Sequence, residues 1–287
     1  NQTPSFIMLS SIRSFKLTIL LLLLLGSSKV NGFSPTNHPL RVGSTLPRPL
    51  TSRHALISPE VIALAETVAP NVGCITSTAL YLAPALSVWK AIQENDMGDL
   101  NPLPVSIMSI VSVSWLAYGL SARDPYVALS NIGGAIASIG YVVGILPVLA
   151  KSQKSLRQTQ TVIMAGVAAV LSLWTYLGVS RAPVSRISTT LGMFASGLFI
   201  ILSGSPLSTI KTVISSRNSA SILGSLTAAQ VINTSLWSAY GLAVKDLFVW
   251  GPNVVGLGLG LVQLLLKVIF PLEGPFLRCM NCGTVHQ

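Results

Sequence analysis

The chain has 287 residues, of which 51% are hydrophobic and 9% are charged, against about 25% charged residues in an ordinary soluble domain. This composition cannot cover a surface in water, so it excludes a soluble domain and is typical of membrane proteins. The net charge of +10 does not indicate nucleic-acid binding, because the basic residues lie in the N-terminal segment and in short loops, not in a stripe interleaved with aromatic residues. Three cysteines, Cys74, Cys279 and Cys282, are too few and too scattered for a disulfide framework.

Residues 1–32 have the layout of a cleaved signal peptide. A basic region precedes the apolar run 17–25, which is about half as long as a membrane span, and small and polar residues then lead to a cleavage site near Gly32. Residues 33–60 are a transit-like or disordered segment, rich in Ser, Thr and Pro. Because this segment opens on Phe33, the pair resembles the two-part presequence of algae with secondary plastids. The alternative is a signal peptide followed by a disordered lumenal tail.

Seven apolar segments follow, and each is long enough for a membrane-spanning helix. They lack the alternation of apolar and polar residues that marks a transmembrane β-barrel. The predicted spans are 68–92, 103–122, 126–150, 161–179, 190–214, 222–244 and 248–271.

The sequence contains an internal repeat with a constant offset of 122 residues. The matched pairs are Trp115 and Trp237, Tyr118 and Tyr240, Asp124 and Asp246, Asn131 and Asn253, and Gly134 and Gly256. A gapless offset across unlike residue types indicates that the chain is built from two copies of one unit.

The repeat predicts an all-α membrane protein of seven transmembrane helices in a 3+1+3 arrangement. Residues 61–150 form the first three-helix repeat, 151–189 the linker helix and 190–271 the second three-helix repeat, and 272–287 form a C-terminal tail. Equivalent positions in the two units are separated by three helices and a linker helix, which is an even number of membrane crossings. Both units therefore cross the membrane in the same direction. They are then related by an axis along the membrane normal.

Basic residues in the loops predict the orientation of the chain. We name the two faces side one, which includes the C-terminal tail, and side two, which includes the turns after the second and sixth spans. Side one collects eight basic residues against four on side two, which places side one in the cytosol or its equivalent. The side-one residues are Lys90, Lys151, Lys154, Arg157, Lys211, Arg217, Lys267 and Arg278, and those of side two are Arg123, Arg181, Arg186 and Lys245.

The ordered motifs of residues 70–271 resemble those of the SWEET sugar facilitators. The first and fifth spans hold Pro84 and Pro206, and the second span opens with Pro104. The third and seventh spans carry Asn131 and Asn253, the latter within Pro-Asn-Val-Val-Gly. The resemblance implies a seven-helix fold, a sugar substrate, substrate-facing asparagines and proline hinges.

The chain departs from this family in two places. The sixth span of the family usually opens with Met-Pro, and here the sequence is Ile222-Leu223-Gly224. Glycine supplies flexibility there, but with a less fixed geometry than proline. Plant members often have a small residue at the position of Trp115, so this chain has a narrower and more symmetric site.

The predicted substrate-binding residues are Asn131, Asn253, Trp115 and Trp237. A sugar offers hydroxyls and apolar C–H faces, which neutral amides and flat indole rings can bind. One of each per repeat would meet at the repeat interface, where transporters bind their substrates. The alternatives are that the asparagines only join helices and that the tryptophans belong to an interfacial aromatic belt.

The predicted hinge and gate residues are Pro84, Pro104, Pro206, Tyr118 and Asp246. A proline removes a backbone hydrogen bond and weakens a helix, although these prolines could also be incidental kinks. The resemblance implies a gate on side two, where Tyr118 reaches Asp246 when that mouth closes. The alternative is that the charged residues after each Tyr-Gly-Leu form a solvated loop.

The predicted function is bidirectional facilitated diffusion of monosaccharides, and by extension disaccharides, through alternating access. None of the spans has an Asp, Glu, Lys, Arg or His residue at its centre, and proton-coupled carriers need such a group. We expect no enzymatic activity, because the spans hold no nucleophile–base or metal constellation. We also expect no cofactor, and treat the single Cys279-Met-Asn-Cys282 as part of an exposed tail.

Two other functions compete with this prediction. A related PQ-loop carrier of amino acids or organic acids, or a seven-helix receptor resembling the KDEL receptor, would be expected to place charged residues in the cavity. The expected partners are a sugar and the lipid bilayer, with association of two or more copies left open and nucleic acid excluded. The membrane is that of a plastid or of the plasma and endomembrane system.

Overall fold

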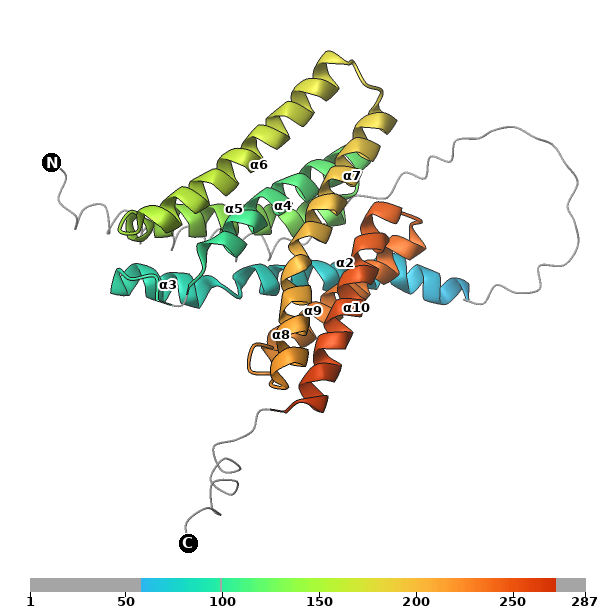
Figure 1. Cartoon of the computed structure of the whole chain (residues 1–287). Helices are drawn as coiled ribbons and strands as arrows, with labels where there is room; N and C mark the ends of the chain where they lie inside the picture. The colour runs from blue at the N-terminus through green and yellow to red at the C-terminus, as the bar shows by residue number, and fades with distance from the viewer. Residues whose placement is uncertain (1–57, 99, 272–287) are drawn as a thin grey trace, which may run out of the picture.

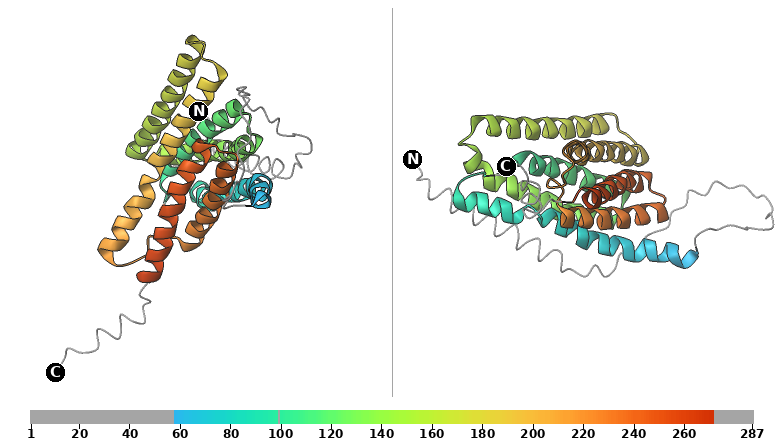
Figure 2. Two further views of the ribbon diagram at one scale, coloured as in Figure 1. Left: turned by 90° about the vertical axis from the view of Figure 1, so that its right-hand side faces the viewer. Right: turned by 60° about the horizontal axis from the view of Figure 1, so that its bottom comes forward.

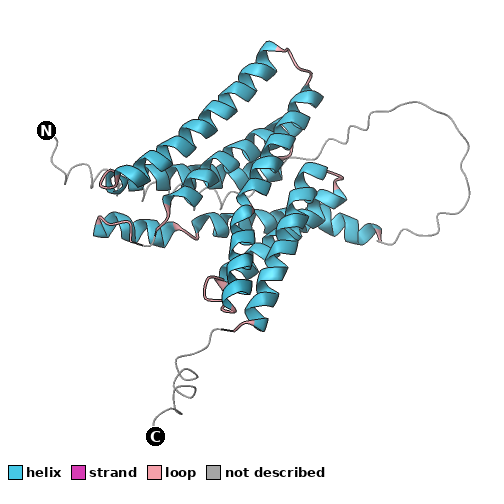
Figure 3. Ribbon diagram, viewed as in Figure 1, coloured by secondary structure: helices cyan, strands magenta, loops and turns pink. Residues whose placement is uncertain are grey.

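The computed structural model of the protein describes residues 58–98 and 100–271. The predicted signal peptide, most of the transit-like segment and the C-terminal tail lie outside these residues. All regular structure in the described part is α-helical (Figure 3). The helices are α2 (Pro59–Leu82), α3 (Ala85–Glu94), α4 (Pro102–Ala122), α5 (Pro125–Leu149), α6 (Gln153–Val179), α7 (Val184–Leu202), α8 (Gly204–Ser216), α9 (Gly224–Ala243) and α10 (Leu247–Ile269).

The helices confirm the predicted all-α membrane fold. Helices α2 and α3 together, α4 and α5 make the first repeat, α6 is the linker, and α7 with α8, α9 and α10 make the second repeat (Figure 1). In the described part of the chain, six segments are long and apolar enough to cross a membrane, with α2–α3 and α7–α8 each counted as one. The segment below this threshold is α9, which carries polar residues such as Gln230 and Asn233.

Three helices begin at least six residues earlier than hydropathy predicts, and one of them is α7, which starts at Val184 instead of residue 190. Helix α2 starts at Pro59 instead of residue 68, because the Ser58 side chain accepts a hydrogen bond from the Val61 amide and proline is favoured in the first turn. Helix α6 starts at Gln153 instead of residue 161, with Ser152 as its N-cap. Hydropathy alone does not locate the starts of α2 and α6, because α6 opens with a polar extension and both starts are set by the N-caps Ser58 and Ser152.

The first span of each repeat is broken at an equivalent place. Helix α2 ends at Leu82 and α3 begins after Pro84, while α7 ends at Leu202 and α8 contains Pro206 near its start. Since proline cannot donate a backbone hydrogen bond, it favours such breaks. Pro104 differs, because it lies in the first turn of α4, where the missing amide hydrogen has little cost. It therefore marks the start of a helix, not a break within one.

The repeats pack on each other through a two-fold-related pair of contacts. Helix α2 packs on α9, and α4 packs on α7. Helix α6 lies against α4 along one side of the bundle (Figure 2). Within the repeats, glycines allow neighbouring backbones to approach closely: a Cβ at Gly119 would lie 2.6 Å from the Ala128 nitrogen, and one at Gly241 would lie 2.6 Å from the Trp250 nitrogen.

The two faces of the bundle differ. On side two, hydrogen bonds described below tie the repeats together. On side one, the ends of α3 and α8 point in different directions (Figure 1). The repeats therefore diverge toward side one.

Candidate functional site

A cavity of about 210 Å³ lies between the two repeats. Its lining follows the internal repeat, because all but two of its residues form pairs that are 122 residues apart. The pairs are Ser77 and Phe199, Leu80 and Leu202, Met108 and Gln230, Val111 and Asn233, Trp115 and Trp237, Val127 and Val249, and Asn131 and Asn253; the remaining two residues are Tyr81 and Ser130. The cavity thus lies near the pseudo-two-fold axis.

The structure brings the four predicted substrate-binding residues together around this cavity. Asn131 comes from α5, Asn253 from α10, Trp115 from α4 and Trp237 from α9. The two tryptophans are only 7% and 6% exposed. An interfacial aromatic belt needs rings at the surface of the protein, so their burial does not fit that alternative. Their role in binding a substrate stays a prediction.

Each asparagine is held by its own helix. The Asn131 Nδ2 donates to the Val127 carbonyl at 2.8 Å, and the Asn253 Nδ2 donates to the Val249 carbonyl at 2.7 Å. Asn131 also accepts a hydrogen bond at Oδ1 from the Tyr81 hydroxyl of α2. Asn131 therefore joins α5 to α2 within the first repeat, as the alternative of helix association requires, whereas the Asn253 amide makes no such bond to another helix among the described residues.

Sequence reasoning missed a polar group that does join the repeats. The Asn233 Oδ1 accepts hydrogen bonds from the hydroxyls of Thr76 at 2.7 Å and Ser77 at 2.9 Å, and Trp237 Nε1 donates to Ser77 at 3.0 Å. The offset places Asn233 opposite Val111, so duplication gave no signal for it. The sequence did offer one signal for Asn233. It is a polar amide within an apolar span, and it lies one helical turn before Trp237, on the same helix face.

On side two, Tyr118 and Asp246 lie together as predicted, and an equivalent pair joins the repeats in the opposite sense. The Tyr118 hydroxyl donates to Asp246 Oδ2 at 2.5 Å, and the Tyr240 hydroxyl donates to Asp124 Oδ2 at 2.8 Å. We call these four residues the side-two lock. They do not form a loop exposed only to solvent.

The aspartates of the side-two lock are also helix N-caps. Asp124 Oδ1 accepts hydrogen bonds from the Tyr126 and Val127 amides, and Asp246 Oδ1 makes the equivalent contacts at the start of α10. Burial raises the pKa of the Asp124 carboxyl, the hydrogen bonds from the backbone and Tyr240 oppose this rise, and the nearby Asp246 adds to it. The lock therefore contains a carboxylate that would gain hydration on opening.

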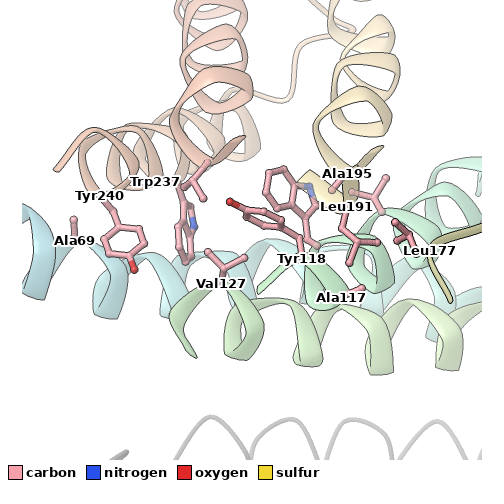
Figure 4. Packing of buried hydrophobic residues seen from close by; sticks show 12 residues of the cluster. Ala69, Ala117, Tyr118, Val127, Leu177, Leu191, Ala195, Trp237 and Tyr240 are labelled. Carbon is pink, nitrogen blue, oxygen red and sulfur yellow. The ribbon is translucent and has the colours of Figure 1, made fainter. Parts of the chain in front are cut away.

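Two equivalent rows of aromatic rings connect the lock to the cavity. The Trp115 ring meets the Tyr118 ring edge to face at 5.7 Å, and the Trp237 ring meets the Tyr240 ring at 5.9 Å. Phe248 extends the first row, and Tyr126 extends the second. Tyr118, Trp237 and Tyr240 lie in one buried cluster between the repeats (Figure 4). This cluster closes the side-two end of the cavity.

The chemistry of the cavity is neutral and hydrogen-bonding. Its lining combines amides, hydroxyls and indole rings, which can bind a polar, uncharged molecule with apolar faces. Among the described residues, no group of three or more His, Cys, Asp or Glu side chains could hold a metal ion. The arrangement fits binding and passage of a small molecule.

Apolar helices, two parallel units and a neutral cavity between them define a multi-pass integral membrane protein with the architecture of a carrier. A family model described as "Sugar efflux transporter for intercellular exchange" matches residues 70–154 and 189–274, and the chain belongs to this family. The two matched ranges correspond to the two repeats, which confirms the predicted resemblance.

Similar proteins come from plants and animals. The chain is 30% identical over 205 residues to the bidirectional sugar transporter SWEET16 of Arabidopsis thaliana, covering 69% of this chain and 86% of the relative. It is 28% identical over 210 residues to the sugar transporter SWEET1 of Drosophila pseudoobscura pseudoobscura, covering 73% and 91%. A solved eukaryotic SWEET transporter matches with a TM-score of 0.66 and 23% identity, over 73% of this chain and 98% of that structure. This last likeness shows the shared fold.

Proposed function

We propose that this protein carries a sugar across a membrane in both directions by facilitated diffusion. One observation supports this most strongly. Each repeat contributes one asparagine and one tryptophan of a matched pair to the cavity, and the pseudo-two-fold axis relates the two contributions. The relatives named as sugar transporters support the same substrate class. The cavity is smaller than the roughly 300–1,000 Å³ of sites for drug-sized ligands, which favours a monosaccharide.

The state described here is closed on side two. Transport requires the side-two lock to open and the diverging side-one ends to approach each other. The helix breaks near Pro84 and Pro206 are the natural positions for this bending, because they already lack continuous backbone hydrogen bonds. Opening on one side with closure on the other would move the cavity's access from side one to side two.

The cavity supports uncoupled transport. Its lining contains no Asp, Glu, Lys, Arg or His among the residues that the structure describes. A carrier that couples its substrate to protons needs an ionisable group that changes its protonation along the path. The two aspartates of the side-two lock do not line the cavity and cap helices at the ends of the spans. We therefore expect a uniporter.

Sugar uptake into proteoliposomes tests this proposal. We expect the wild-type protein to equilibrate labelled glucose, and Asn253→Ala to reduce the initial rate by about tenfold or more, since a cavity amide that meets sugar hydroxyls is lost. Asn71→Ala is a matched control, because Asn71 is exposed and donates only to its own helix at the Thr67 carbonyl. Wild-type liposomes that take up no more glucose than empty ones would contradict the proposal.

The sequence of residues 1–60 bears on the membrane in which the protein acts. We propose that residues 1–60 direct it to a plastid membrane by way of the secretory system, in the manner of an alga with a secondary plastid. The competing outcome is the plasma or endomembrane system. Fusing residues 1–60 to a fluorescent protein in an alga of this kind separates them, since plastid labelling supports the first destination and secretion or reticular labelling rejects it.

A further inference from the structure

The two cavity asparagines differ in how their hydrogen-bonding capacity is used. The Asn131 Oδ1 accepts from the Tyr81 hydroxyl at 2.9 Å, and its Nδ2 donates to the Val127 carbonyl and to Ser130 Oγ. The Asn253 Nδ2 donates to its own helix, but its Oδ1 has no hydrogen-bond partner among the described residues. The Asn253 carbonyl oxygen therefore has both acceptor positions free among the described residues, whereas the Asn131 carbonyl oxygen has one of its two already occupied.

The position of Tyr81 is fixed by its surroundings. Its ring fills the space left by the missing side chain of Gly134, because a Cβ there would clash with that ring. The buried Tyr141 donates its hydroxyl to the Tyr81 backbone carbonyl at 3.0 Å. This carbonyl lies in the last turn of α2, just before the break at Pro84. The hydroxyl of Tyr81 is thus held over Asn131, beside the break of the first span.

The second repeat has no such arrangement. The offset of 122 places Ser203 opposite Tyr81, and the Ser203 hydroxyl donates to the Phe199 carbonyl of its own helix at 2.9 Å. Ser203 does not line the cavity, whereas Tyr81 does. On the same side as Asn253, Gln230 also lines the cavity, and its side-chain amide makes no hydrogen bond to the described residues. The free amide groups are therefore concentrated on the second repeat.

We infer that Tyr81 is a positioning residue that makes the two halves of the sugar site unequal. This inference rests on the proposed sugar transport. The Tyr81 hydroxyl occupies one of the two acceptor positions of Asn131 Oδ1 and competes with a sugar hydroxyl for it, so the sugar binds first to Asn253 and Gln230. The sugar has only the second acceptor position of Asn131 Oδ1 available unless Tyr81 releases the first. This competition lowers the affinity for sugar without blocking the site.

Glucose binding to purified full-length protein and its Tyr81→Phe variant tests the inference. The ring stays in the space at Gly134 while the competing donor is removed. We expect the dissociation constant to fall roughly three- to tenfold, the effect of one net hydrogen bond. Tyr176→Phe, an exposed tyrosine on α6, controls for the exchange and should leave the constant unchanged. An unchanged or weaker affinity of Tyr81→Phe at equal folded protein overturns the inference.

A double-mutant cycle distinguishes competition from a structural effect of Tyr81. Asn131→Ala should weaken binding more in the Tyr81→Phe background than in the wild type, by the same roughly three- to tenfold factor. The loss from Asn253→Ala should be equal in both backgrounds. Equal losses from Asn131→Ala in the two backgrounds overturn the inference.

Two further comparisons keep the test decisive. If Tyr81→Phe does not fold, as judged by size-exclusion chromatography, the single variants still decide: Asn253→Ala must cost more affinity than Asn131→Ala, and equal losses reject the asymmetry. Failure of the proposed function has a different signature, because the wild-type protein then binds and transports no glucose. A wild type that binds glucose while the Tyr81 variants behave as controls rejects this inference alone.

Discussion

At the scale of single residues, Trp115 and Trp237 set the width of the cavity. Both rings are buried, and each meets a tyrosine of the side-two lock edge to face. Trp237 is also fixed through its Nε1 by the Ser77 hydroxyl, but no equivalent hydrogen bond to Trp115 occurs among the described residues. Trp115 is therefore the ring whose replacement disturbs the fewest polar contacts.

Trp115→Ser should favour larger sugars. Removing the indole enlarges the cavity, so we expect the ratio of sucrose to glucose transport rates to rise several-fold. Truncating a buried tryptophan costs about 3–5 kcal/mol of stability, so rates must be compared at equal amounts of folded protein. Leu171→Ser, at an exposed position on α6, is a control that should keep the wild-type ratio. If Trp115→Ser also keeps it, Trp115 does not limit the size of the substrate.

Some residues of the site could be predicted from the sequence, and others could not. The paired asparagines and tryptophans could be predicted because each occurs twice at one offset. Asn233 and Tyr81 could not, because valine and serine stand opposite them in the other repeat. Their importance comes from contacts between helices that are far apart in sequence, such as the bond from Thr76 to Asn233. Such contacts depend on the packing of the repeats, which periodicity does not specify.

At the scale of helices, the first span of each repeat is a pair of shorter helices. The seven predicted segments are helical and follow one another in the predicted order, and six of them are long and apolar enough to cross a membrane among the described residues. The break in each first span was anticipated only through its proline. The extra turns at the start of α2 and α6 were missed because the spans were predicted from apolar runs alone, whereas Ser58 and Ser152 set the helix starts as N-caps.

The three prolines should differ in their importance for turnover. Pro84→Ala and Pro206→Ala allow a continuous helix across the breaks, so we expect each to lower the maximal transport rate at least threefold with little change in the half-saturating sugar concentration. Pro104→Ala is the matched control, because its position in the first turn of α4 requires no bending. The measurement is the concentration dependence of glucose uptake. A loss from Pro104→Ala as large as that from Pro84→Ala would reject the hinge assignment.

At the scale of the whole molecule, the pseudo-two-fold arrangement explains both closure and access. The contacts of α2 with α9 and of α4 with α7 are equivalent, and so are the two hydrogen bonds of the side-two lock. Duplication gives each half of the lock a tyrosine and an aspartate that pair with the other repeat. The closed side is therefore symmetric, while the free side-chain amide groups of the cavity lie mainly on the second repeat.

The central claim is that the protein lets a sugar cross in both directions without coupling to an ion gradient. Counterflow in proteoliposomes tests it most directly: vesicles loaded with unlabelled glucose receive trace labelled glucose outside, with and without a protonophore. We predict a transient internal excess of label that decays as the unlabelled sugar leaves, with the same time course in both conditions. Absence of the transient, or its loss when the proton gradient is collapsed, would contradict the account.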